Sequence, residues 1–228
     1  MSDMGIQQNW KVTIGKDNPI KRYNGYAMFP FLVFDNWYTP EEEKIVWKEL
    51  DFLSTKPKDE MHRAENTIVA RQKDGTSKSK AFRFYIEELY KNRNTSPIIK
   101  YTYKQRSPEF HKLIENNCMP FARSFVTSNT DTCFVSYYEE KDHYKPHHDV
   151  SLWTCLIWMV REPRLFNGGD FKLNEPDVEV KLKNNRMIMF PSCFLHSVSP
   201  VSFHTQPTEI GYGRYCITHF YNSEGKDV

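Results

Sequence analysis

Residues 132–160 read TCFVSYYEEKDHYKPHHDVSLWTCLIWMV, in which apolar runs at 132–138 and 152–160 flank a polar segment. Short runs rich in aromatic and β-branched residues are typical of β-strands. Similar runs follow, separated by turn residues, at 170–173, 178–182, 186–190, 196–201 and 212–221. Many short strands at this spacing favour an antiparallel sandwich or barrel.

The chain before residue 129 has a different pattern, which includes a well-formed helix start. Thr39-Pro40-Glu41-Glu42 combines a capping residue, a proline suited to the first turn and a glutamate that can close a capping box. The apolar face of this helix would consist of Ile45, Val46, Leu50 and Leu53. Further helices are expected over 80–91, 107–118 and 119–126, and a strand over 26–34.

Residues 53–79 are polar and irregular, and they predict a long loop whose role the sequence leaves open. In the helix expected over 80–91, the buried residues would include Phe84, Leu89 and Tyr90. The fold class expected is therefore α+β. A single domain would span residues 1–228, with helical support over about 1–129 and a β-rich core over about 130–222.

Composition narrows the class of protein. The 228 residues are 39% hydrophobic and 15% aromatic, which suffices for a packed core. Five cysteines, an odd number with no C-x-x-C pair, argue against a disulfide framework. The net charge of +2 is too small to indicate a nucleic-acid partner. Because there is no apolar signal segment and no stretch of membrane-spanning length, we expect a soluble, cytoplasmic protein with no membrane contact.

The polar segment contains a candidate metal site, His147-His148-Asp149. Side chains two residues apart in an extended chain point the same way, so His147 and Asp149 share a face while His148 points away. A further histidine, His196, lies in an otherwise apolar run. Two histidines and one carboxylate form the facial triad that suits non-haem Fe(II) and leaves coordination positions open.

Arg214 is the candidate residue for binding an anion. It lies in the apolar run 212–221, where a guanidinium costs several kcal/mol of desolvation unless an anion meets it. Its planar fork matches a carboxylate at two points, and Thr218, four residues on, faces the same side of a strand. The alternative is a structural ion pair with Glu179 or Glu209.

From about residue 133 to residue 220 the chain resembles the prolyl 4-hydroxylase-like branch of the 2-oxoglutarate/Fe(II)-dependent dioxygenase superfamily. The motifs that carry the resemblance occur in the family's order and are Tyr138…Tyr144-Lys145-Pro146-His147-His148-Asp149, Thr154-Cys155-Leu156-Ile157-Trp158, Gly168-Gly169-Asp170-Phe171, Arg186-Met187-Ile188-Met189-Phe190, His196-Ser197-Val198-Ser199-Pro200-Val201 and Gly213-Arg214-Tyr215-Cys216-Ile217-Thr218. The resemblance implies a double-stranded β-helix, a distorted jelly roll whose mouth holds the metal.

The resemblance also assigns roles to residues. It implies that His147, Asp149 and His196 are both catalytic residues and metal ligands. It implies a co-substrate site in which Arg214 binds the distal carboxylate of 2-oxoglutarate, with other contacts from Tyr138, Thr218, Trp158 and Phe171. The implied cofactors are Fe(II), 2-oxoglutarate and O2, with ascorbate as an optional reductant. One departure from the family pattern is the long gap of 214 − 196 = 18 residues, which an inserted loop near 202–209 would absorb.

By the same resemblance, the expected activity is hydroxylation of a substrate C–H, with release of succinate and CO2. The expected substrate is a prolyl residue in a protein or peptide, held between the loop 53–79 and the insert near 202–209. Aromatic residues that could contact such a chain are Tyr101, Tyr103, Tyr144 and Trp153. Three alternatives stay open: a hydroxylase of a small molecule or free amino acid, a non-enzymatic cupin-like metal-binding module, and an oxygenase acting on nucleic acid.

Overall fold

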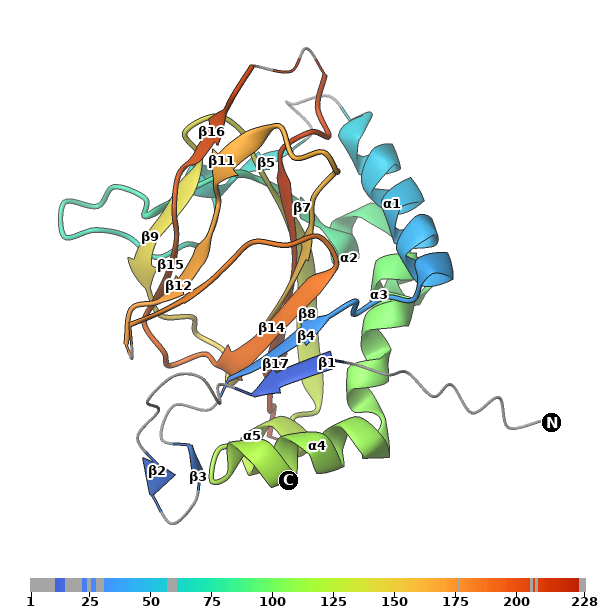
Figure 1. The fold of residues 1–228 in the computed structure, drawn as a ribbon, viewed down its shortest axis with the longest axis vertical. Helices are drawn as coiled ribbons and strands as arrows, with labels where there is room; N and C mark the ends of the chain where they lie inside the picture. The colour runs from blue at the N-terminus through green and yellow to red at the C-terminus, as the bar shows by residue number, and fades with distance from the viewer. Residues whose placement is uncertain are drawn as a thin grey trace.

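The computed structural model describes residues 11–14, 22–23, 26–27, 31–56, 61–175, 177–205, 207 and 209–225. Two antiparallel sheets lie face to face, and the longer helices lie outside one of them (Figure 1). This is the arrangement of a double-stranded β-helix with added helices, so the α+β expectation is confirmed.

The larger sheet, called the major sheet here, has eight strands in the order β1-β4-β14-β10-β17-β8-β7-β5. Its strands are β1 Lys11–Ile14, β4 Leu32–Asp35, β5 His62–Arg63, β7 Phe82–Tyr85, β8 Thr130–Tyr138, β10 Trp153–Met159, β14 Arg186–Pro191 and β17 Arg214–Asn222. The minor sheet has five strands in the order β13-β12-β15-β9-β6. Its strands are β6 Ser79–Lys80, β9 His143–His147, β12 Phe171–Leu173, β13 Val178–Val180 and β15 His196–Val198.

Two short strand pairs and several helices complete the described chain. The pairs are β2 Arg22–Tyr23 with β3 Tyr26–Ala27, and β11 Phe166–Gly168 with β16 Val201–Phe203. The α-helices are α1 Pro40–Ser54, α2 Ile86–Leu89, α3 Pro97–Thr102, α4 Pro108–Cys118 and α5 Ala122–Val126. Single 3-10 turns occupy Ala64–Asn66, Arg93–Thr95 and Tyr103–Arg106.

The two-residue period of the major sheet divides the interior into two layers. In β8, Cys133, Val135 and Tyr137 pack in the layer shared with the helices. Tyr138 belongs to the other layer, between the two sheets, and Phe134 and Ser136 border a cavity there. Successive side chains of a strand point to opposite faces, so each strand contributes to both layers.

The helix start at Thr39 forms as expected. Thr39 and Glu42 make a reciprocal capping box at the start of α1, and Pro40 occupies the first turn. Three of the four residues expected on its apolar face, Val46, Leu50 and Leu53, are buried, but Ile45 is exposed and that part of the prediction is wrong. The helix buries polar Glu49 as well, which accepts hydrogen bonds from Ser96 Oγ and the Ile98 amide at 2.7 and 2.8 Å, at the start of α3.

The prediction of a helix over 80–91 is wrong. Residues 79–80 form β6, residues 82–85 form β7 and only 86–89 are helical. Phe84 is buried as expected, while Leu89 and Tyr90 are partly buried. The segment Phe82-Arg83-Phe84 has a two-residue alternation that suits a strand, and pairing with β8 outweighs its local helix propensity.

The other expected elements are found with shifted ends. The helix over 107–118 is α4, the one over 119–126 is shortened to α5, and α3 was not anticipated. The strand expected over 26–34 corresponds to β3 and β4, with residues 28–30 outside the described part. Each run from 132 to 221 contains a strand, and the run 196–201 contains β15 and the start of β16.

The first half of the chain is not only helical support. Its strands β4 and β7 extend the major sheet by pairing with β14 and β8 of the second half. We propose from this shared sheet that the chain folds as a single domain. Among the described residues, no helix combines the length and the apolar character needed to cross a bilayer.

A partly buried cluster of Arg93, Asp131 and His219 joins β8 and β17 to the 3-10 turn at Arg93. Asp131 accepts a hydrogen bond from Arg93 Nη2 at 2.7 Å, and His219 Nδ1 lies 3.4 Å from the same carboxylate oxygen. Burial alone would raise the pKa of Asp131, but His219 and Arg93 together hold the pKa below its usual value. A carboxylate with a lowered pKa stabilises the fold above the pKa of the unfolded state, and this stability is lost as the pH falls through the folded-state pKa.

We therefore expect Asp131→Asn to lower the free energy of unfolding by about 1–3 kcal/mol at neutral pH, with a smaller difference from wild type in acid. Urea denaturation at both pH values measures this. Asp177→Asn is the control, because that side chain is 75% exposed. A difference between Asp131→Asn and wild type that does not change with pH would show that the lowered pKa of Asp131 does not contribute to stability.

Candidate metal and co-substrate site

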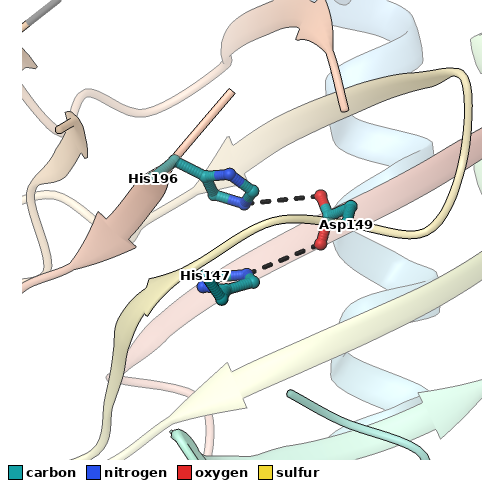
Figure 2. Close-up of side chains that lie close together, drawn as sticks. All are labelled: His147, Asp149 and His196. Atoms are coloured by element: carbon teal, nitrogen blue, oxygen red, sulfur yellow. Dashed lines mark ion pairs between the residues drawn. The ribbon is translucent and has the colours of Figure 1, made fainter. Parts of the chain in front are cut away.

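The three residues predicted as metal ligands meet at one end of the minor sheet. His147 ends β9, His196 begins β15, and the two are register partners across these strands. Asp149 follows β9 by two residues and lies between both imidazoles (Figure 2). Asp149 Oδ1 lies 3.5 Å from His147 Nε2, and Asp149 Oδ2 lies 3.3 Å from His196 Nε2. These three residues are called the triad below.

The triad has the spacing of a metal site. One ligand atom from each residue lies within 4.8 Å of the other two. Ligand atoms about 2.1 Å from a metal and at right angles to one another are about 3 Å apart, which is close to the 3.5 and 3.3 Å between the Asp149 oxygens and the two Nε2 atoms.

Backbone contacts set the tautomer of both imidazoles. Nδ1 of His147 lies 2.8 Å from the Lys145 carbonyl oxygen, and Nδ1 of His196 lies 2.8 Å from the Phe194 carbonyl oxygen. A carbonyl oxygen only accepts, so each Nδ1 carries the proton and each Nε2 offers a lone pair toward Asp149. This is the arrangement in which an imidazole coordinates a metal.

Hydroxyl groups orient Asp149. Thr154 Oγ1 donates to Asp149 Oδ2 at 2.6 Å, and Ser192 Oγ lies 2.8 Å from Thr154 Oγ1 and 2.6 Å from Ser151 Oγ. Neither Thr154 nor Ser192 was predicted to have a role in the site. The available signal was a threonine on the inner face of β10, where apolar residues would otherwise be expected.

The protonation states suit metal binding. Burial lowers the pKa of His147, which keeps the imidazole neutral. Burial by itself would raise the pKa of Asp149, but the adjacent imidazoles of His196 and His147 hold it well below its usual range. Near neutral pH the site therefore presents a neutral imidazole at His147 and a carboxylate at Asp149, which are forms that ligate a metal.

Arg214 lies at the start of β17, fully buried, and none of its three guanidinium nitrogens has a hydrogen-bond partner among the described residues. Its guanidinium lies 4.8 Å from the ring centroid of Tyr138 and 5.6 Å from that of Trp158. The alternative ion pair is not found within the described chain, and Glu179 instead pairs with Lys181. A buried guanidinium without a counter-ion indicates that an anion is the missing partner.

Glycine makes room for this arginine. A Cβ atom at Gly169 would lie 2.9 Å from Arg214 Cδ, and the φ angle of Gly169 is +69°, a conformation that other residues rarely adopt. Gly169 of the sequence motif thus has a direct steric role beside the arginine, whereas a Cβ atom at Gly168 would clash with the Pro200 carbonyl oxygen.

A cavity of about 220 Å³ opens over the triad. Tyr138 and Thr218 border it, as expected, whereas Trp158 and Phe171 are fully buried and do not reach its surface. The ring of Tyr144 stacks on His147 with centroids 3.4 Å apart, and its hydroxyl accepts from the Ala70 amide at 3.4 Å. The segment around Ala70 therefore forms one wall of the cavity.

Several aromatic residues considered for substrate contact lie elsewhere. Trp153 is buried between the major sheet and the helices, and Tyr101 and Tyr103 pack against that same layer. Their expected contact with a bound chain is wrong, because the alternation of β10 turns Trp153 away from the cavity. Arg83, which sequence analysis did not single out, borders the cavity instead.

Comparison with known proteins gives a consistent result. Residues 133–222 match the family model of the 2OG-Fe(II) oxygenase superfamily. A PKHD-type hydroxylase from Crocosphaera subtropica is 28% identical over an 88-residue alignment, which covers 34% of this chain and 40% of that protein. The chain therefore spans less than half the length of this curated relative.

Two solved structures share the fold at low sequence identity. A Pseudomonas putida prolyl-4-hydroxylase aligns with a TM-score of 0.56 and 12% identity, over 87% of this chain and 95% of its own. A prolyl hydroxylase from Trichoplax adhaerens, in complex with a hypoxia inducible factor oxygen degradation domain peptide fragment, aligns with a TM-score of 0.57 and 16% identity, over 85% of this chain and 83% of its own. The family match over residues 133–222 and the shared fold show that this chain is similar to 2OG-Fe(II) oxygenases, and prolyl hydroxylases are among the proteins that share its fold.

Proposed function

We propose that the chain is an Fe(II)- and 2-oxoglutarate-dependent dioxygenase that hydroxylates a substrate C–H bond. This proposal rests on two observations together: a triad arranged to bind a metal, and the buried guanidinium of Arg214, which has no hydrogen-bond partner among the described residues. A cupin-like module that only binds a metal has no use for such an arginine, because burying it without an anion is costly.

In this proposal His147, Asp149 and His196 hold the metal. The hydroxyl of Thr154 keeps the Asp149 carboxylate turned toward both imidazoles, and the Lys145 and Phe194 carbonyls fix the tautomers. Three protein ligands would leave coordination positions of the metal open for the co-substrate. When bound, Fe(II), 2-oxoglutarate and O2 supply the oxidising chemistry, which releases succinate and CO2.

Arg214 would bind the distal carboxylate of 2-oxoglutarate through its planar fork. Thr218, which borders the cavity on the same face of β17, would add a hydroxyl contact, and Tyr138 would cover the guanidinium. The surrounding apolar residues exclude water, which strengthens this charge pairing.

The proposed substrate is a prolyl residue in a peptide. Two apolar side chains at the edge of the cavity, Ile68 and Val150, are 97% and 96% exposed, and an extended chain could cover them. The structural relative in complex with a peptide fragment supports this class of substrate. A free amino acid is the second candidate, because a cavity of about 220 Å³ also suits a small molecule.

The metal assignment predicts a difference between two adjacent histidines. We expect His147→Ala to weaken Mn(II) or Fe(II) binding by more than the roughly 10- to 100-fold typical of outer-shell changes. His148→Ala should bind the metal as wild type does, because its Nδ1 is engaged with the Cys193 carbonyl oxygen at 2.9 Å. Calorimetric titration of both variants measures this, and equal affinities would rule out the assignment.

The co-substrate assignment predicts that Arg214→Ala weakens 2-oxoglutarate binding by at least roughly 30-fold, the effect of about 2 kcal/mol lost from a buried charge pair. Anaerobic titration with Fe(II) and 2-oxoglutarate reports binding as a visible charge-transfer band. Arg123→Ala, on the exposed side of α5, should titrate like wild type. Wild type without a band would favour the metal-binding module.

The substrate assignment predicts that proline-containing peptides stimulate conversion of 2-oxoglutarate to succinate and gain one oxygen atom on the prolyl residue. Mass spectrometry of a peptide panel measures this, with alanine in place of proline as the matched control. Stimulation by free amino acids alone would favour the second candidate.

A further inference from the structure

A second buried arginine, Arg83, lies next to one edge of the major sheet. Arg83 lies in the middle of β7 and borders the same cavity as the triad. It is the register partner of Ser136 on β8, which in turn is the partner of Cys216 on β17, and both of those residues also border the cavity. Phe82 and Phe84 pack in the layer shared with the helices, so strand alternation turns the arginine inward.

The charge of Arg83 has no counter-ion in the described chain. The residue is 6% exposed. Its Nη1 donates to Thr67 Oγ1 at 3.2 Å, and its guanidinium carbon lies 4.8 Å from the ring centroid of Phe134. Its Nε has no hydrogen-bond partner in that part of the chain. A neutral hydroxyl and an aromatic face do not neutralise a buried cation, so the free energy of burial is left uncompensated.

The protein provides carboxylates for comparable arginines elsewhere. Arg93 pairs with Asp131 at 2.7 Å, and Arg186 pairs with Asp35 at 2.6 Å. Both of these arginines are more exposed than Arg83, with side-chain exposures of 22% and 18%. Arg83 is more buried than these two arginines, yet no carboxylate among the described residues pairs with it. This indicates that a ligand supplies its partner.

Arg83 is separate from the proposed co-substrate arginine. Arg214 is the register partner of Tyr138, which lies two residues along β8 from Ser136, the partner of Arg83. With strands about 4.8 Å apart and about 3.4 Å per residue along a strand, the two arginine Cα atoms are roughly 12 Å apart. A co-substrate bound by the triad and Arg214 would leave Arg83 available to another anion.

We propose that Arg83 binds a carboxylate of the substrate and so selects an acidic substrate. This inference rests on the function proposed above, because it needs a substrate to enter the cavity. The guanidinium would form two parallel hydrogen bonds to the carboxylate, in an apolar surrounding that includes Phe134 and Tyr144. The same carboxylate chemistry is offered by an acidic residue next to the target residue in a peptide and by a free amino acid.

The test compares probes that differ only in a carboxylate. The protein is loaded with Mn(II) and 2-oxoglutarate, so that the site is filled but does not turn over. One arm uses N-acetylated, amidated peptides in which proline is followed by glutamate or by glutamine. The other arm uses N-acetyl-L-proline and its amide. Calorimetry gives the affinity of each probe for wild type, Arg83→Gln, Arg83→Lys and the control Arg123→Gln.

We expect the carboxylate member of at least one pair to bind wild type about tenfold more tightly than its amide, as two charge-assisted hydrogen bonds would give. Arg83→Gln should abolish this preference, Arg83→Lys should keep part of it, and Arg123→Gln should keep all of it. The arm that shows the preference identifies the source of the carboxylate. No preference in either arm, or a preference that survives in Arg83→Gln, would overturn the inference.

Two further readouts separate the possible causes of failure. Mn(II) and 2-oxoglutarate affinities are measured on the same samples, and their absence in wild type would overturn the proposed function together with this inference. The thermal midpoint of Arg83→Met without probe should equal or exceed that of wild type, because an uncompensated buried charge is removed. A clearly lower midpoint with unchanged probe binding would show that Arg83 is structural.

Discussion

The register between β9 and β15 is the constraint on which the functional site depends. His147 and His196 are direct partners across these strands, and both imidazoles turn toward the carboxylate of Asp149. A slip of one residue would turn either histidine to the other face of the sheet and separate the ligands. The relative positions of the three ligands therefore depend on the strand register of the minor sheet. The apolar packing between the two sheets stabilises that register.

A second constraint is the cost of burying charge between the sheets. Asp149 is compensated by two imidazoles and a hydroxyl, and Arg93 and Arg186 in the major sheet region are compensated by carboxylates. Arg214 and Arg83 have no such partner in the described chain. Proteins keep uncompensated charge where function requires it, at some cost in stability. Arg83, which borders the cavity, and Arg214, which is fully buried beside Tyr138 and Trp158, are thus two separate positions for anions.

The two-residue alternation of the major sheet connects fold to function. It separates a helix-facing layer, which contains Trp153 and Phe84, from the layer that contains the cavity. The helix predicted over 80–91 gave no indication of the position of Arg83, because helical spacing does not place it on the opposite face from Phe82 and Phe84. Pairing of β7 with β8 overrides the local preference and sends Arg83 to the cavity. The position of Arg83 at the cavity therefore follows from tertiary strand pairing, and the local sequence pattern did not predict it.

The sequence alone determined the strand pattern of the second half, the helix starting at Pro40, the identity of the triad and the role expected of Arg214, because these depend on local periodicity and on residue types with few alternative uses. Only the tertiary structure decided which groups share the cavity. Thr154 reaches Asp149, Arg83 borders the cavity, and Trp153, Tyr101 and Tyr103 lie behind the major sheet. These placements depend on strand register and on contacts between distant segments, which local sequence does not specify.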